Sequence, residues 1–176
     1  TSTVSVTSAA IYTYSIYLKA AERSWAYLQI EGGTTGVGAN FNLTNGTIGT
    51  CNAGTTASII NVSNGWYRCV VSGNVGTGNI YPTVYIMYAD TIFTYVGVVG
   101  YGIYLWGEQL ELGPTASSYI PTLGSTVTRV LEGGITNFIP KSNRVTVYAE
   151  FKLNSSTTGY WVLGFRPAGT GSANSP

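Results

Sequence analysis

Apolar and polar residues alternate with a period of two along most of the first two thirds of this chain. In residues 12–18 every second residue is Tyr, Ile or Leu, and in residues 26–30 every second residue is Ala, Leu or Ile. Successive side chains of a strand point to opposite faces of a sheet, so this alternation is typical of a strand with one face on a core. No segment shows the sustained helical period of about 3.6 residues. The sequence therefore predicts an all-β fold.

Turn signals divide the chain into short strands. Asn45-Gly46 and Asn64-Gly65 are hairpin signals because both residue types tolerate positive φ. Pro82 indicates an edge position or a bulge, since proline cannot donate a ladder hydrogen bond. Besides the two alternating segments, strands are predicted at residues 37–43, 47–51, 57–62, 66–72, 80–89 and 101–112, with a short one at 92–96. About eight or nine strands at this spacing predict an antiparallel sandwich or barrel, and a jelly roll is the first choice.

The composition excludes several classes of partner. Only 9% of the 176 residues are charged and the net charge is +1, so no cluster of Lys and Arg is available for nucleic acid or an anionic membrane. No apolar run approaches the roughly 20 residues of a membrane helix. The Thr/Ser-rich start lacks the basic and apolar regions of a signal peptide. Neither nucleic acid nor membrane is an expected partner.

Catalysis and metal binding are constrained by the absence of histidine. This removes Ser-His-Asp and Cys-His arrangements and His-containing metal sites, and two cysteines cannot complete a four-cysteine zinc site. Glu108 and Glu111 are an odd number of residues apart on a predicted strand, so they should point to opposite faces and not act as a glycosidase pair. We expect no enzyme activity, catalytic residue, cofactor or metal. Glu111 should bond turn amides or Arg129, with a structural Ca²⁺ as the alternative.

Three motifs occur in order along residues 10–130. They are the run YTYSIYLKAAERS at residues 12–24, GWYR at 65–68, and GIYLWGEQLELGP at 102–114, followed by SYIPT and STVTR up to Arg129. Together they resemble a β-sandwich module of bacteriophage head-fibre and tail-fibre proteins, a concanavalin A-like or carbohydrate-binding-module-like jelly roll. Glu108 departs from the pattern, which usually has Ala there. The resemblance implies a virion fibre or decoration protein, carried on the extracellular particle and assembled in the bacterial host cytoplasm.

The strand at residues 80–88 contains candidate ligand contacts. Its predicted core residues are Ile80, Val84 and Ile86, which leaves Tyr81, Thr83, Tyr85 and Met87 on the other face. An exposed Tyr81 and Tyr85 could stack on sugar rings, because aromatic faces combine apolar area with a polar rim. The alternative is that a tyrosine-rich face packs on a neighbouring subunit.

The tryptophans are assigned by their position in the alternation and in the motifs. Trp25 lies opposite the apolar side of its strand and is a third candidate ligand contact. Trp66 and Trp106 lie inside the motifs of the resemblance and are expected to be structural core anchors. Arg68 is expected to pair with a carboxylate at the sheet surface, which makes it structural as well.

The two cysteines allow two interpretations. Cys51 and Cys69 both lie in predicted strands and could form a disulfide across a sheet pair. They could equally be separate thiols that behave as small apolar residues, which a reducing cytosol would favour.

Domain organisation follows from a change of texture after Arg129. We expect one jelly-roll β-sandwich in residues 1–130 and the first hairpin of a second, incomplete β module in residues 131–176. That hairpin, at residues 145–151 and 160–165, cannot bury a core alone. Truncation near Pro176 is favoured over completion by another subunit, because residues 169–172 resemble a loop leading to a third strand.

The function expected is therefore a non-enzymatic phage fibre or decoration module that displays a surface for host glycan attachment. The alternatives are a purely architectural, oligomerising virion protein and an accessory carbohydrate-binding module of a bacterial hydrolase. Low charge and high tyrosine content would leave apolar area on a lone sandwich. The expected partners are other copies of the chain in a homotrimer, other virion proteins and a bacterial surface glycan.

Overall fold

A computed structural model of the chain describes residues 3–122 and 126–128. The chain divides into two units, residues 1–132 and 133–176, and every described residue belongs to the first unit. Regular structure in the described part consists of strands only, arranged as two antiparallel sheets. The predicted all-β sandwich is confirmed. Arg129 and the hairpin predicted in residues 145–165 lie outside the described residues.

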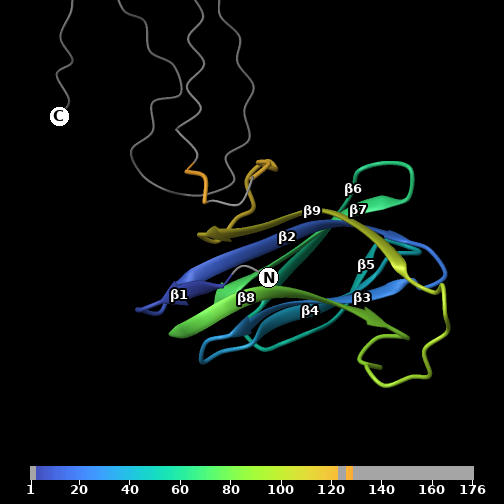
Figure 1. The fold of residues 1–176 in the computed structure, drawn as a ribbon, viewed down its shortest axis with the longest axis horizontal. Coiled ribbons are helices and arrows are strands. Elements are labelled where there is room, and N and C mark those ends of the chain that lie inside the picture. Colours follow the sequence, from blue (N-terminus) through green and yellow to red (C-terminus); the bar gives the residue numbers. More distant parts are fainter. Residues whose placement is uncertain (1–2, 123–125, 129–176) are drawn as a thin grey trace, which may run out of the picture. The chain divides into compact units, whose positions relative to one another are not determined.

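The two sheets contain five and four strands. The first sheet has the order β1-β8-β3-β4-β5 and the second the order β6-β7-β2-β9, and the sheets lie as two layers (Figure 1). The strands of the first sheet are β1 (Val4–Val6), β8 (Gly78–Met87), β3 (Trp25–Gly32), β4 (Val37–Asn42) and β5 (Thr47–Cys51). Those of the second are β6 (Thr56–Asn61), β7 (Trp66–Asn74), β2 (Ile11–Ala20) and β9 (Ile103–Leu112). Strand β1 pairs with β8 in one sheet and β2 pairs with β7 in the other, and β9 adds to the free side of β2.

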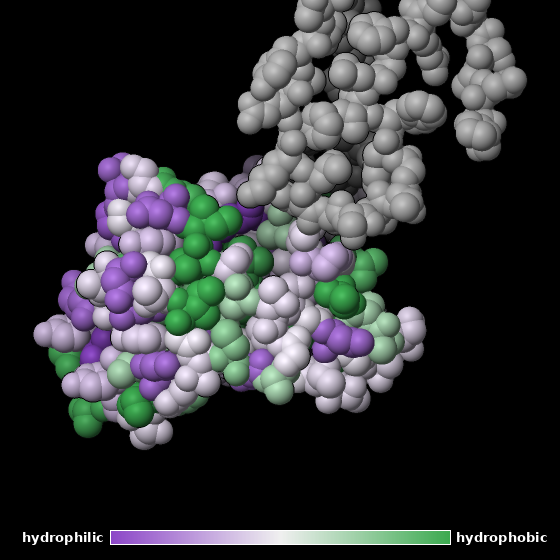
Figure 2. Space-filling view, turned by 180° about the vertical axis from the view of Figure 1, so that it is seen from behind, coloured by the Kyte–Doolittle hydropathy of each residue, from purple (hydrophilic) through white to green (hydrophobic). Residues whose placement is uncertain are grey.

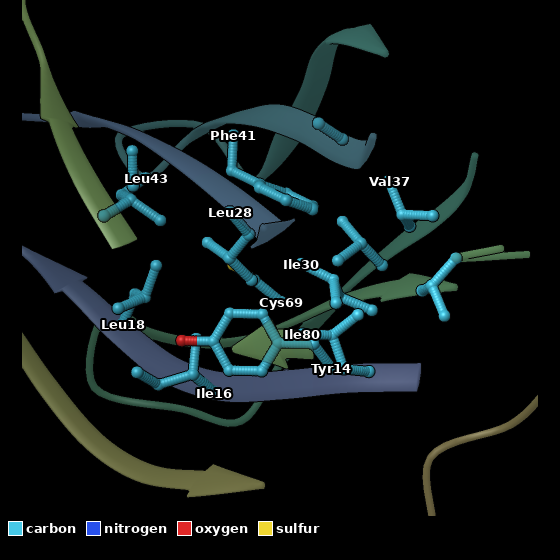
Figure 3. Close-up of a cluster of buried hydrophobic side chains, with 14 of the residues drawn as sticks. Tyr14, Ile16, Leu18, Leu28, Ile30, Val37, Phe41, Leu43, Cys69 and Ile80 are labelled. Carbon is cyan, nitrogen blue, oxygen red and sulfur yellow. The ribbon is translucent and has the colours of Figure 1, made fainter. Parts of the chain in front are cut away.

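The core lies between the layers and follows the alternation of the sequence. Tyr14, Ile16 and Leu18 of β2 point toward Leu28 and Ile30 of β3, and all five side chains are buried (Figure 3). Each large aliphatic side chain removed from water contributes about 1.5–3 kcal/mol. The apolar sides predicted for these two strands are therefore correct, and they hold the two sheets together.

The second side of β2 is also buried, which the alternation does not predict. The Thr13 and Ser15 side chains point away from the core yet are buried. The Thr13 hydroxyl donates to the Gly113 carbonyl oxygen at 2.6 Å. The segment after β9 thus returns across the outer face of the second sheet and covers part of it.

Strand β8 keeps its predicted faces, but burial follows those faces at one end only. Ile80 is buried as predicted, and Pro82 pairs with β3 beyond the end of β1, so it lies at a local edge. At the other end the faces are also as predicted, since Ile86 pairs with Ala26 and Met87 with Trp25 without a register shift, but Ile86 is 37% exposed and Met87 is buried. Met87 lies on the outer face, where the following loop folds back.

The loop between β8 and β9 contains no strand at residues 92–96, contrary to prediction. Only an isolated bridge joins Ala89 and Ile92. The Arg23 guanidinium lies over the rings of three loop tyrosines, at 5.4 Å from Tyr88, 4.7 Å from Tyr95 and 5.3 Å from Tyr101. Cation–π contacts rather than a ladder therefore hold this loop.

Candidate functional site

The outer face of the five-stranded sheet brings Tyr81 and Tyr85 together with Glu31. In the register of β3 and β8, Tyr81 lies opposite Glu31 and Tyr85 lies opposite Tyr27. The Tyr85 hydroxyl donates to the Glu31 carboxylate, and the Tyr85 side chain is 38% exposed. Phe93 packs edge-on against Tyr27 and Tyr85, with ring centroids 5.2 and 6.1 Å apart. We call these five residues the tyrosine face.

The tyrosine hydroxyls of this face are held in their neutral, donating form. The Glu31 carboxylate raises the pKa of Tyr81 and the pKa of Tyr85 above the ordinary value of tyrosine, chiefly through hydrogen bonding. A carboxylate offers about four acceptor positions, so two tyrosine donors leave capacity for further donors. The face therefore combines fixed aromatic rings with an acidic acceptor.

The base of the tyrosine face is built by Tyr27, which the sequence analysis did not single out. Its ring is buried, and its hydroxyl accepts a hydrogen bond from Asn52 Nδ2 at 2.9 Å. A Cβ on Gly38 would lie 2.4 Å from the Tyr27 hydroxyl oxygen, so only glycine lets this side chain cross β4. The signal for Tyr27 was its position two residues from Trp25, on the same side of the strand.

Trp25 shares the outer face with the tyrosines, as predicted, but it is partly buried. Its partner across the strands is Met87, and a Cβ on Gly49 of β5 would lie 2.8 Å from the Trp25 ring. The three predicted ligand contacts thus occupy one face, with Trp25 packed toward β5. Ligand binding by any of them remains a prediction.

Trp106 is not a core anchor, because a β-bulge turns it outward. Ser15 pairs with Gln109 while Tyr17 pairs with Trp106, so Gly107 and Glu108 together oppose one residue of β2. Gly107 has a φ of 65°, the left-handed conformation of the first residue in this kind of bulge. The extra residue reverses the sidedness of β9, and Trp106 is 55% exposed on the outer face.

The same bulge places Glu108 on the side of β9 that faces the core, although Glu108 itself is exposed. The Tyr14 hydroxyl, buried in the core, donates to Glu108 Oε1 at 3.1 Å. Burial, and then the nearby Glu108 carboxylate, raises the pKa of Tyr14. Glu108 and Glu111 thus point to opposite faces, as predicted, and the acid that replaces Ala of the resemblance accepts a bond from the core tyrosine.

Trp66 also lies on the outer face, so its assignment to the core is wrong. It pairs with Lys19, whereas the neighbouring Tyr67 pairs with Leu18 and packs against the core. Cys69 and Val71 are both buried, so the alternation along β7 places Tyr67 on the core side and Trp66 on the outer side. Trp66 and Trp106 line one pocket on the outer face of the four-stranded sheet.

Arg68 and Glu111 hold the returning segment against the four-stranded sheet. Arg68 donates from one terminal nitrogen to Ser15 Oγ at 3.0 Å and to the Ser117 carbonyl at 2.5 Å. The predicted pairing with a carboxylate is therefore wrong. Glu111 accepts from the Ser117 amide at 3.0 Å, the turn-amide alternative. Both residues have a structural role in this geometry.

The cysteines are free thiols, so the disulfide alternative is wrong. Cys51 is exposed on β5 and Cys69 is buried on β7, in the other sheet. Burial raises the pKa of both thiols, with Asp90 adding to the effect at Cys51. Neither thiol is activated as a nucleophile, because activation requires a lowered pKa.

Within residues 3–122 and 126–128 no group of three or more Cys, Asp or Glu side chains is arranged to hold a metal ion. The same residues include no helix with the length and apolarity to cross a bilayer. No protein-family model and no curated protein matches the sequence of this chain.

Proposed function

We propose that this chain is a non-enzymatic module of a phage fibre or decoration protein, and that its tyrosine face binds a glycan of the bacterial surface. The observation that carries the proposal is the exposed Tyr85 on the same face as Tyr81, with its hydroxyl bonded to the Glu31 carboxylate. The virion assignment rests on the resemblance of the three motifs.

A sugar ring matches the chemistry of the tyrosine face. Its C–H face is apolar and stacks on aromatic rings, while its hydroxyls can donate to the free acceptor positions of Glu31. Because the Tyr85 hydroxyl already donates to Glu31 and its ring packs against Phe93, little freedom of this side chain is lost on binding. The absence of histidine from the chain supports binding without catalysis.

The tyrosine face is tested by binding of the labelled chain to an array of bacterial surface glycans. We expect selective binding that falls at least about tenfold in Tyr85→Ala and in Tyr81→Ala, because each variant removes a stacking ring. Tyr104→Ala removes an exposed tyrosine from the other sheet and is the matched control. Binding that survives both tyrosine-face variants contradicts the assignment of this face.

A second candidate function is architectural, and the loop between β8 and β9 favours it. Val96 is 88% exposed and Val99 is fully exposed at 102%, and patches of apolar residues are visible on the face drawn in Figure 2. Apolar area of this kind suits contact with another subunit of a homotrimer. Light scattering distinguishes the two functions, since a monomer at high concentration contradicts the oligomerising role.

A further inference from the structure

A second aromatic site lies on the sheet opposite the tyrosine face. Its pocket has a volume of about 260 Å³ and opens on the outer face of the four-stranded sheet. The pocket is lined by Tyr17, Val62, Ser63, Asn64, Trp66 and Trp106, and we call it the tryptophan pocket. No lining side chain carries a charge, so its chemistry is aromatic with a neutral polar rim.

The exposed Trp106 ring is a rigid platform. Its centroid lies 5.2 Å from the Tyr17 ring and 4.7 Å from the Tyr119 ring, so aromatic neighbours support it on two sides. The Arg68 guanidinium lies 5.5 Å from the Tyr17 centroid and is itself bonded to Ser117. A large apolar surface that is both exposed and fixed is suited to stacking, since little freedom is lost on binding.

The polar rim comes from a strained turn between β6 and β7. Ser63 has a φ of 85°, Asn64 of 52° and Gly65 of 76°, three consecutive residues in the left-handed region. Backbone bonds fix the turn, from the Trp66 amide to the Ser63 carbonyl at 2.9 Å and from the Val62 amide to the Trp66 carbonyl at 3.0 Å. Strain of this kind at non-glycine residues persists where the surroundings over-determine it, and it clusters at binding sites.

The two rim side chains are available to a ligand. Neither the Ser63 hydroxyl nor the Asn64 carboxamide donates or accepts a hydrogen bond within the described part of the chain, and both residues are exposed. A hydroxyl and a carboxamide each donate and accept, which matches the vicinal hydroxyls of a sugar. A phosphate or carboxylate ligand would instead call for Arg or Lys in the lining, and Lys19, whose stem lies beside Gly65 of the turn, does not line the pocket.

We propose that the tryptophan pocket binds one neutral pyranose ring, stacked on Trp106 and hydrogen-bonded to Asn64 and Ser63. Its volume is below the roughly 300–1,000 Å³ of pockets for drug-sized ligands, so it suits a single ring better than a chain. An extended proline-rich peptide requires a longer aromatic groove. The pocket is independent of the tyrosine face and does not rest on the function proposed for that face.

The test is saturation-transfer NMR of the full chain with methyl glycosides of glucose, galactose, mannose and N-acetylglucosamine. We expect saturation of the ring protons of at least one glycoside, and an affinity at least about tenfold lower in Trp106→Ala, where the stacking platform is lost. Asn64→Gly keeps a residue suited to positive φ while removing the carboxamide, so it should weaken binding with the fold intact. Its binding result remains decisive if Trp106→Ala fails to fold.

The control is Val99→Ala, which changes a fully exposed loop residue outside both aromatic sites and should bind these glycosides as the parent chain does. Absence of saturation for all four glycosides overturns the proposal. So does binding that is unchanged in Trp106→Ala and Asn64→Gly, or binding lost only in Tyr85→Ala. A parent chain that self-associates in light scattering, and a Trp106→Ala variant that does not, would also overturn it by identifying a second copy as the occupant.

Discussion

The two outer faces of this sandwich are both aromatic, but different parts of the chain decide which rings remain exposed. On the five-stranded sheet the tyrosine face is fixed by contacts between neighbouring strands, chiefly the bond from Tyr85 to Glu31. On the four-stranded sheet the segment after β9 covers one part, and the tryptophan pocket occupies another part. The exposed surface of a sandwich thus depends on where non-strand segments return across it, as much as on strand alternation.

The largest effect is expected from releasing the returning segment. Arg68→Ala removes the hydrogen bonds to Ser15 and to the Ser117 carbonyl and the contact with the Tyr17 ring. Loss of charged hydrogen bonds that leaves partners unsatisfied should lower the free energy of unfolding by about 2–4 kcal/mol, measured by urea denaturation. Arg68→Lys keeps the charge without the planar guanidinium, so its free energy of unfolding should lie between those of the parent chain and Arg68→Ala. An unchanged midpoint in Arg68→Ala would show that the segment is held by other contacts.

The bulge in β9 is tested by Gly107→Ala. Alanine must adopt a φ of 65°, and its Cβ would lie 2.9 Å from Tyr17 Cδ2. The free energy of unfolding should fall by about 1–3 kcal/mol, the usual cost of such backbone strain. Gly97→Ala is the matched control, because nothing lies within 4 Å of a Cβ there. Equal stability of the two variants would contradict the left-handed conformation of Gly107 on which the bulge depends.

The sequence predicted the two-layer fold and most strands because the core imposes a strict alternation on β2 and β3. Trp106 was assigned to the core from its place in the motif, and alternation alone does not reveal the bulge at Gly107 that turns it outward. Trp66 was assigned from its motif, although the alternation of Cys69 and Val71 puts its neighbour Tyr67, and not Trp66, on the core side. The burial of Met87 and the exposure of Ile86 depend on the loop after β8, which folds back. Such a tertiary contact cannot be predicted from the local sequence pattern.

The same bulge predicts a pH dependence through Glu108 and Tyr14. Burial, followed by the Glu108 carboxylate, raises the pKa of Tyr14 above the ordinary tyrosine value of 10.0. Above that pH the unfolded chain releases the proton while the folded chain retains it, so the free energy of unfolding falls as the pH rises. One such group contributes a slope of at most about 1.4 kcal/mol per pH unit.

Tyr14→Phe should therefore show a shallower loss of stability between about pH 9 and 11, measured by urea denaturation at each pH. At lower pH it should be less stable by about 1 kcal/mol, the usual worth of one hydrogen bond. Tyr104→Phe, at an exposed position, controls for the loss of a tyrosine. Parallel curves for the parent chain and Tyr14→Phe would contradict the raised pKa of the buried Tyr14.

The smallest effect on stability is expected from Arg23, whose loop reaches the tyrosine face rather than the tryptophan pocket. Arg23→Ala removes three cation–π contacts and should change the free energy of unfolding by about 1 kcal/mol or less. The loop that carries Phe93 should nevertheless open more often, because its bridge from Ala89 to Ile92 is isolated. Hydrogen exchange of residues 88–102 should accelerate while exchange in β2 and β3 is unchanged, and Arg23→Lys should give a smaller increase. If Arg23→Ala also weakens glycan binding at Tyr85, then Phe93 contributes to the tyrosine face. If hydrogen exchange of the loop is unaffected, the tyrosine rings hold the loop without Arg23.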